Sequence, residues 1–216
     1  MQHVPPPFPP PARPPAQSRY APQAGEQFRR IWRADEAAFR DHLLRLDPQS
    51  RHDRFGFGVS DDFIARYAER CFGMDDVIHG FFVDGVLRGA GELRGLGHGL
   101  PLAFGGAAEA AFSVEKDWRG RGIGTELMER IVRAARNRRA GELYMSCLPH
   151  NTPMQRIARK FAAVLQHDVD QVDAAFKPLA ASPASVWQEM VEDSASFAIA
   201  MVDLQKRTWL KDKPAE

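Results

Sequence analysis

The sequence predicts an α/β or α+β domain in which a mixed sheet is flanked by helices. Short apolar runs with strand-like alternation are interleaved with segments whose apolar residues recur every three or four positions. Some of the strand-like runs are also close enough in sequence to form hairpins. Helices between strands allow parallel pairing and hairpins require antiparallel pairing, so the two together indicate a mixed sheet with helices on its faces.

The first 24 residues differ in composition from the rest of the chain. They contain nine prolines and few core-forming residues, so this segment favours extended polyproline conformations and is expected to be a disordered tail. A ligand for an SH3-like groove, or a tether, is the alternative role for such a tail. Residues 25–180 are predicted to form the globular domain, and residues 181–216 a C-terminal helical extension.

The first half of the globular domain contains strands, two helices and a hairpin. Asp35 and Ser60 are the expected N-caps of the helices, Asp47-Pro48 ends the first helix, and Asp84-Gly85 suits the turn of the hairpin. The predicted elements are a strand over 28–33, helices over 35–46 and from 60, hairpin strands over 77–83 and 86–93, and a glycine-rich loop over 95–106.

The second half repeats the strand and helix alternation. Ile123, Leu127 and Ile131 recur at four-residue steps, which predicts an amphipathic helix, and Asn151 is the expected N-cap of the next helix. The predicted elements are a strand over 108–115, a helix over 122–139, a strand over 143–148, a helix from 151, a hairpin within 164–176 and a final helix over 185–209.

Charge and composition argue against several classes of function. The formal net charge is +1, which gives no global attraction to nucleic acid or to an anionic membrane. A solvated helix face is expected for the basic run, with contact to an acidic partner as the alternative; its members are Arg130, Arg133, Arg136, Arg138 and Arg139. No apolar run is long enough to span a membrane, the N-terminus has no apolar signal region, and two cysteines make no disulfide framework, so a cytoplasmic protein is expected.

The most informative segment is the loop Arg119-Gly120-Arg121-Gly122-Ile123-Gly124, which joins a predicted strand to a predicted helix. Glycines let backbone N–H groups approach an anion closely, and a helix N-terminus adds partial positive charge. The loop therefore predicts a phosphate site. An ordinary strand-to-helix turn that needs glycine is the alternative interpretation. The dinucleotide and P-loop fingerprints fit less well, because Thr125 stands where the former needs its third glycine and the latter is absent.

The loop and its neighbours resemble the GCN5-related N-acetyltransferase (GNAT) family. The residues that carry the resemblance are 108–114, Asp117-Trp118, 119–128, Asn151 and Pro153-Met154. The order of elements fits over about residues 27–180, and the resemblance implies a twisted, mostly antiparallel mixed sheet with an extra C-terminal helix. The likeness is strongest to single-domain bacterial members and to the acetyltransferase domain of bacterial protein lysine acetyltransferases, which share a segment like 50–55 and a helix like 151–161.

The resemblance implies that acetyl-CoA is the co-substrate. In the family the pyrophosphate lies on loop amides, here about Arg121 to Thr125, with Arg119 and Arg121 adding charge, and the pantetheine arm pairs with the preceding strand. Asn151 matches a position that contacts the coenzyme arm, and a simple N-cap is its alternative role. The implied coenzyme-binding residues are Phe112, Ser113, Val114, Arg119, Gly120, Arg121, Gly122, Ile123, Gly124, Thr125 and Asn151.

The reaction implied is direct attack of an amine on the thioester, which needs a base for the amine proton. Glu109 matches the strand position where many relatives carry a glutamate base; a surface glutamate is the alternative. Strand alternation places Glu109, Ala111 and Ser113 on one face, opposite the apolar face. Many relatives carry a tyrosine seven residues after the matching asparagine, where it acts as the general acid that protonates the leaving thiolate. This chain has Ala158 there.

Two hypotheses about function therefore stand. The first is an N-acetyltransferase acting on a small amine or a protein lysine, and the second is a non-catalytic acyl-CoA-binding regulatory or interaction module. No nucleic acid or membrane partner is expected, and the C-terminal helix would either cap the core or form a homodimer interface. No metal is expected, because Cys147-x-x-His150 is at most half of a metal site.

Overall fold

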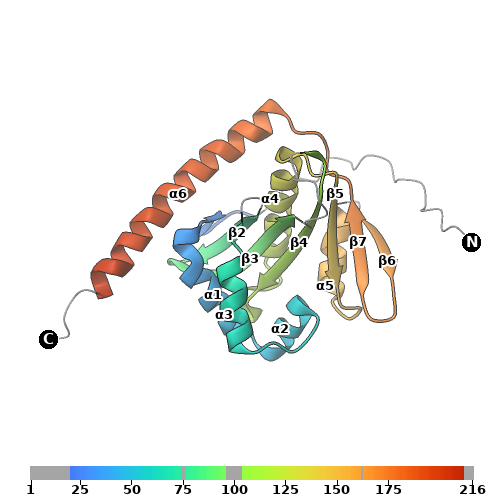
Figure 1. Cartoon of the computed structure of the whole chain (residues 1–216), viewed down its shortest axis with the longest axis horizontal. Coiled ribbons are helices and arrows are strands. Elements are labelled where there is room, and N and C mark those ends of the chain that lie inside the picture. The colour runs from blue at the N-terminus through green and yellow to red at the C-terminus, as the bar shows by residue number, and fades with distance from the viewer. Residues whose placement is uncertain (1–19, 74–75, 96–103, 162, 212–216) are drawn as a thin grey trace, which may run out of the picture.

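A computed structural model describes residues 20–73, 76–95, 104–161 and 163–211. Its centre is one seven-stranded sheet of order β1-β2-β3-β4-β5-β7-β6 (Figure 1). All neighbouring strands are antiparallel except β4 and β5, so the sheet is mixed and mostly antiparallel, as predicted. The strands are β1 Glu26–Ile31, β2 Val77–Val83, β3 Val86–Gly95, β4 Ala107–Val114, β5 Glu142–Cys147, β6 Val164–His167 and β7 Val172–Phe176.

Helices cover both faces of the sheet. One face carries α1 and α3, whose Phe39 and Ile64 pack in a core with Phe82 of the sheet. The other face carries α4 and α5, where Met128 packs with Phe161 in a second core. The helices are α1 Glu36–Arg45, α2 Pro48–Phe55, α3 Asp61–Arg70, α4 Ile123–Asn137, α5 Thr152–Lys160 and α6 Pro183–Lys211, with short 3-10 turns at Arg33–Asp35 and Lys116–Trp118.

Strands β4 and β5 separate along their length. They pair only at their beginnings, where Ala107, Ala108 and Glu109 lie opposite residues 142–144. Beyond Glu109, β4 continues to pair with β3, while β5 pairs with β7 on its other side. The sheet therefore opens between β4 and β5, and the β5-facing edge of β4 from Ala110 to Val114 has no strand beside it among the described residues.

Most local predictions in the first half are confirmed, and one helix, α2, was not predicted. The Ser60 side chain caps α3 by accepting from the Phe63 N–H, at 3.2 Å, and Asp84 and Gly85 both have positive φ, as a tight hairpin turn requires. Asp35 is the N-cap residue of α1, as predicted, but its side chain makes no cap hydrogen bond, because its carboxylate is buried against the Arg29 guanidinium, at 2.8 Å. Asp47-Pro48 ends the first helix but also begins α2, with the Asp47 carboxylate as the cap.

Helix α2 was not predicted, because its sequence has no apolar residues at helical spacing. Its sequence PQSRHDRF is almost entirely polar and only eight residues long. Most of the predicted glycine-rich loop and the proline-rich tail as far as residue 19 lie outside the described residues. No helix among the described residues is both long and apolar enough to cross a membrane.

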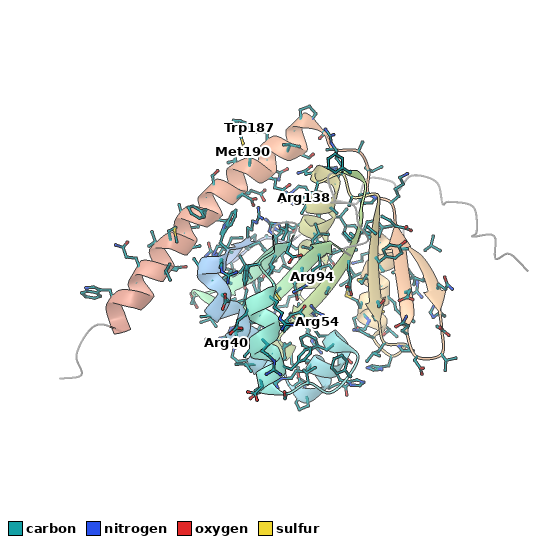
Figure 2. All side chains as sticks on the ribbon, in the orientation of Figure 1. Arg40, Arg54, Arg94, Arg138, Trp187 and Met190 are labelled. Atoms are coloured by element: carbon teal, nitrogen blue, oxygen red, sulfur yellow. The ribbon has the colours of Figure 1, made fainter. Side chains whose placement is uncertain are left out.

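Helix α6 contacts β1 and α4 and runs along one side of the domain (Figure 1). Its polar side chains face inward. Glu189 accepts from Arg138, and Glu192 accepts from Arg130 and Arg133, so the arginines of α4 are not the solvated face that was expected. The large apolar side chains of α6 face solvent instead, and Figure 2 shows Trp187 and Met190 on the outer side of the helix. This arrangement is the reverse of an ordinary surface helix.

Candidate functional site

A pocket opens beside the separated end of β4. It has a volume of about 470 Å³, which is within the usual range for small-molecule and cofactor sites. Its walls come from α2, the end of β4, the glycine loop and the first turns of α4 and α5. Of the residues implied to bind coenzyme, those that line the pocket are Phe112, Ser113, Val114, Arg119, Gly120, Gly122, Ile123, Gly124, Thr125 and Asn151.

The glycine loop brings the N-terminus of α4 to the pocket. Gly120 and Gly122 have φ values of +76° and +91°, in the left-handed region that favours glycine. Gly122 is the N-cap residue and provides no side-chain cap. The first N–H groups of a helix have no intrahelical acceptor and can bind an anion. The N–H of Thr125 already donates to the Gly122 carbonyl, at 3.0 Å, so the N–H groups available to an anion are those of residues before Thr125.

Basic side chains surround this helix terminus. Arg119 donates to the Val114 carbonyl at 3.0 Å and to the Ser50 hydroxyl at 2.7 Å, which fixes its guanidinium at the pocket wall. Arg156 and Lys160 of α5 add two more cations. They were not predicted from the sequence, although their four-residue spacing after the capping residue Asn151 places them on one side of the helix. Backbone amides and three cations make this end of the pocket suitable for phosphate groups.

Arg121 is placed differently from Arg119. Its guanidinium lies over the Trp118 ring, 4.6 Å from the ring centre, and donates to the Asp117 carbonyl at 3.2 Å. Arg121 is therefore outside the set of pocket-lining residues. Asn151 caps α5 by accepting from the Met154 N–H at 3.3 Å and also lines the pocket, so its capping role and a coenzyme contact are compatible.

Glu109 lies where β4 and β5 part. It is half-buried, is the last β4 residue paired with β5, and is opposite Arg94 of β3. The expected alternation is present, because Ala110 and Phe112 pack under α4 while Ser113 points to α1. Glu109 does not line the pocket, and as the last β4 residue paired with β5 it lies at the closed, deep end of the opening between these two strands.

An ion network behind the pocket was not predicted. Glu92 is fully buried and accepts from Arg54 at 2.6 Å, from Arg94 at 2.9 Å and from the Tyr67 hydroxyl at 2.8 Å. Figure 2 shows Arg54 and Arg94 close together under α3, and Arg54 also lines the pocket. Burial alone would raise the pKa of Glu92, but the charges of Arg54 and Arg94 prevail and lower it, so the carboxylate is ionised.

Ala158, Cys147 and His150 are not placed to supply an acid, a nucleophile or a metal site, although His150 binds Asp53, which lines the pocket. Ala158 is fully buried in the core, so it leaves no gap for a proton donor at that position. Burial raises the pKa of the Cys147 thiol, which makes it a poor nucleophile, and the exposed His150 binds Asp53 at 2.8 Å. In the part of the chain that is described, no group of three or more His, Cys, Asp or Glu side chains could hold a metal ion.

Comparisons with known proteins agree with this geometry. The model of the Acetyltransferase (GNAT) family matches residues 29–163. A search of curated protein sequences finds no match.

Solved structures share the fold at low sequence identity. The GNAT domain of S. lividans PAT is 22% identical with a TM-score of 0.61, and the match covers 70% of this chain and 90% of that domain. The acetyltransferase yncA of Salmonella typhimurium, solved with its cofactor acetyl-CoA, is 15% identical with a TM-score of 0.56 over 74% of this chain and 98% of its own.

RimL, a ribosomal L7/L12 alpha-N-protein acetyltransferase solved with coenzyme A, is 13% identical with a TM-score of 0.55 over 72% of this chain and 95% of its own. The likenesses to these structures establish the fold, and the family model covers more than half of the chain. The chain therefore belongs to the GNAT acetyltransferase family.

Proposed function

We propose that the protein transfers an acetyl group from acetyl-CoA to a primary amine, on a small molecule or a protein lysine, by direct attack. The observation that carries this proposal is the pocket at the split between β4 and β5, with a helix N-terminus at one end. A pyrophosphate would lie on the loop amides near Gly122 to Gly124, between Arg119 and the two cations of α5. An extended pantetheine arm would pair with the open edge of β4 at 112–114.

The activity assay follows from this assignment. The full chain would be incubated with acetyl-CoA and a panel of small amines and lysine peptides, and release of free CoA thiol would be measured. Amine-dependent release supports the proposal. Tight acetyl-CoA binding with no turnover on any amine would instead favour a non-catalytic acyl-CoA-binding module, the alternative that Ala158 suggests.

Glu109→Gln is expected to lower kcat for amine acetylation by roughly 100-fold or more, because it removes the proposed base at the deep end of the opening. The Kd for acetyl-CoA should not change, since Glu109 is outside the pocket lining. Steady-state kinetics and calorimetric titration of acetyl-CoA would measure the two quantities. Glu142→Gln, on the neighbouring strand, is the control, and equal losses in both variants would refute the base role.

We also propose that α6 pairs with α6 of a second copy of this chain. The polar side of the helix is occupied by its own domain, and its exposed apolar side chains are Val186, Trp187, Met190, Val191, Phe197, Ile199, Met201, Val202, Leu204 and Trp209. Each partner of a standard interface contributes about 800 Å² of surface. The exposed parts of these ten large side chains together provide an area of that order. From 183 to 205 the helix has no lysine or arginine, so it lacks the positive charge typical of helices that bind anionic lipid.

Met190→Glu is expected to convert a dimer into a monomer, because it would place a charge within the proposed apolar interface. Light scattering coupled to size-exclusion chromatography would measure the mass. Gln188→Glu adds the same charge at another exposed position of α6 and should leave the dimer intact. A wild-type mass equal to one chain at micromolar concentration would contradict the proposed dimer.

A further inference from the structure

A serine, a histidine and a glutamate form a hydrogen-bonded series that ends at the pocket. The Ser113 hydroxyl on β4 lies 2.9 Å from Nε2 of His42 on α1. Nδ1 of the same ring lies 3.2 Å from Oε1 of Glu115, just beyond the end of β4. His42 is fully buried and neither it nor Glu115 lines the pocket, whereas Ser113 does, so the series borders the pocket at its serine end.

The charges around Glu115 fix the direction of these hydrogen bonds. Burial alone would raise its pKa, but hydrogen bonds from His42 and Arg88 and the charge of Arg45 bring the pKa to about 2. Glu115 is therefore a carboxylate that only accepts, with Arg45 Nε and Arg88 Nη1 each at 2.9 Å. His42 must then donate its Nδ1–H to Glu115.

The remaining ring nitrogen faces the serine. Burial lowers the pKa of His42, with hydrogen bonding to Glu115 opposing the shift, so the ring is neutral at neutral pH and Nε2 carries a lone pair. The Ser113 O–H therefore donates to Nε2, with its oxygen lone pairs directed elsewhere. A nucleophile, a base that accepts its proton, and a carboxylate that orients the base are the three components of an activated serine.

Ser113 also has a suitable position for attack on a thioester. It lies between Phe112 and Val114 on the part of β4 that has left β5, along the open edge assigned above to the coenzyme arm. One face of that strand segment is covered by α4 and the other by α1, so the pocket is the route by which an extended ligand would reach the hydroxyl.

We propose that Ser113 is a nucleophile that gives this protein a second activity, the hydrolysis of acyl-CoA thioesters through an acyl-serine. The proposal rests on the acetyl-CoA site proposed above. Ser113 Oγ forms a bond to the thioester carbonyl carbon while its proton passes to His42 Nε2. The C–S bond breaks, and the leaving thiolate takes that proton, giving free CoA and acetyl-Ser113.

A water molecule completes the cycle. It attacks the acetyl-Ser113 carbonyl carbon while His42 Nε2 takes one of its protons, the C–O bond to Ser113 breaks, and the serine oxygen takes that proton back, releasing acetic acid. His42 is thus the proton donor to the thiolate in this reaction, a role for which position 158 has no suitable side chain.

The test uses the full chain with acetyl-CoA and no amine. An acid quench followed by peptide mass mapping should find one acetyl group on Ser113, and free CoA should accumulate. Ser113→Ala should lose the adduct and release CoA at least about 100-fold more slowly, and Glu115→Gln should slow acylation while Ser113 remains present. Acetyl-CoA binding by each variant, measured by calorimetry, separates a lost nucleophile from a lost coenzyme site.

A second substrate makes the test independent of coenzyme binding. p-Nitrophenyl acetate carries an activated ester without a CoA moiety, so Ser113-dependent release of p-nitrophenolate would support the nucleophile even if acetyl-CoA did not bind. A folded Ser113→Ala that matches wild type on both substrates, with no adduct on the wild-type serine, would overturn the inference. In that case Ser113, His42 and Glu115 simply tie α1 to β4.

Discussion

Glu92→Gln is expected to lower the free energy of unfolding by about 3–5 kcal/mol, the cost of breaking a buried ion pair on one side. Glu92 has no exposed surface and is the partner of both Arg54 and Arg94. Without its charge, two guanidinium groups remain close together behind the pocket with no compensating anion. Urea denaturation followed by circular dichroism would measure the loss.

Two further variants distinguish charge imbalance from a general loss of packing. Glu69→Gln on the exposed side of α3 should change stability by less than about 0.5 kcal/mol. Adding Arg94→Gln to Glu92→Gln removes the excess positive charge, so the double variant should be more stable than additivity predicts. Strict additivity would show that the two groups are not energetically coupled.

The same ion network makes the stability difference depend on pH. Because the folded-state pKa of Glu92 lies below its ordinary value of 4.5, its contribution is present above that value and is lost as the pH falls through the folded-state pKa. The gap between wild type and Glu92→Gln should therefore narrow on acidification. A gap that widened below pH 4.5 would contradict this sign.

Gly120→Ala is expected to weaken acetyl-CoA binding by roughly tenfold to a hundredfold. The loop turns at Gly120 with a φ of +76°, a Cβ there would meet no protein atom within 4 Å, and Gly120 lines the pocket proposed for the coenzyme, so the expected effect of the added methyl group is on the ligand. Displacing the anion from the loop would lose one charge-assisted hydrogen bond, worth about 1.5–3 kcal/mol. Calorimetric titration would give the Kd.

Gly56→Ala is a closely matched control. Gly56 ends α2 with a φ of +78°, and a Cβ there also meets nothing within 4 Å, but the residue does not line the pocket. Both substitutions should cost about 1–2 kcal/mol of stability through left-handed strain, and only Gly120→Ala should alter the Kd. Equal changes in Kd would mean that strain, and not the site, is responsible.

The end of the pocket proposed to bind phosphate was largely predictable from the sequence. Glycines at positive φ, a following amphipathic helix and an N-capped second helix are local features, and each depends on residues only a few positions apart. The Ser60 cap and the Asp84-Gly85 turn were predictable for the same reason. Asp35 shows where such local prediction fails: its carboxylate binds the buried Arg29, six residues away, and makes no hydrogen bond to the helix N-terminus.

The chain's own sequence therefore determined the mixed sheet, the order of its elements and the glycine loop at the start of α4, because those depend on short-range periodicity, turns and caps. Three contacts were decided only by the tertiary structure. His42 hydrogen-bonds to Ser113, 71 residues away, and Glu92 pairs with Arg54 of the unpredicted helix α2. Helix α6 faces the domain with its polar side. Such contacts depend on which elements the sheet brings together, and a charged residue carries no local sign of the distant partner it will meet. The glycine loop was thus predictable from residues 119–124, whereas the chemistry proposed beside it depends on contacts that only the folded chain makes.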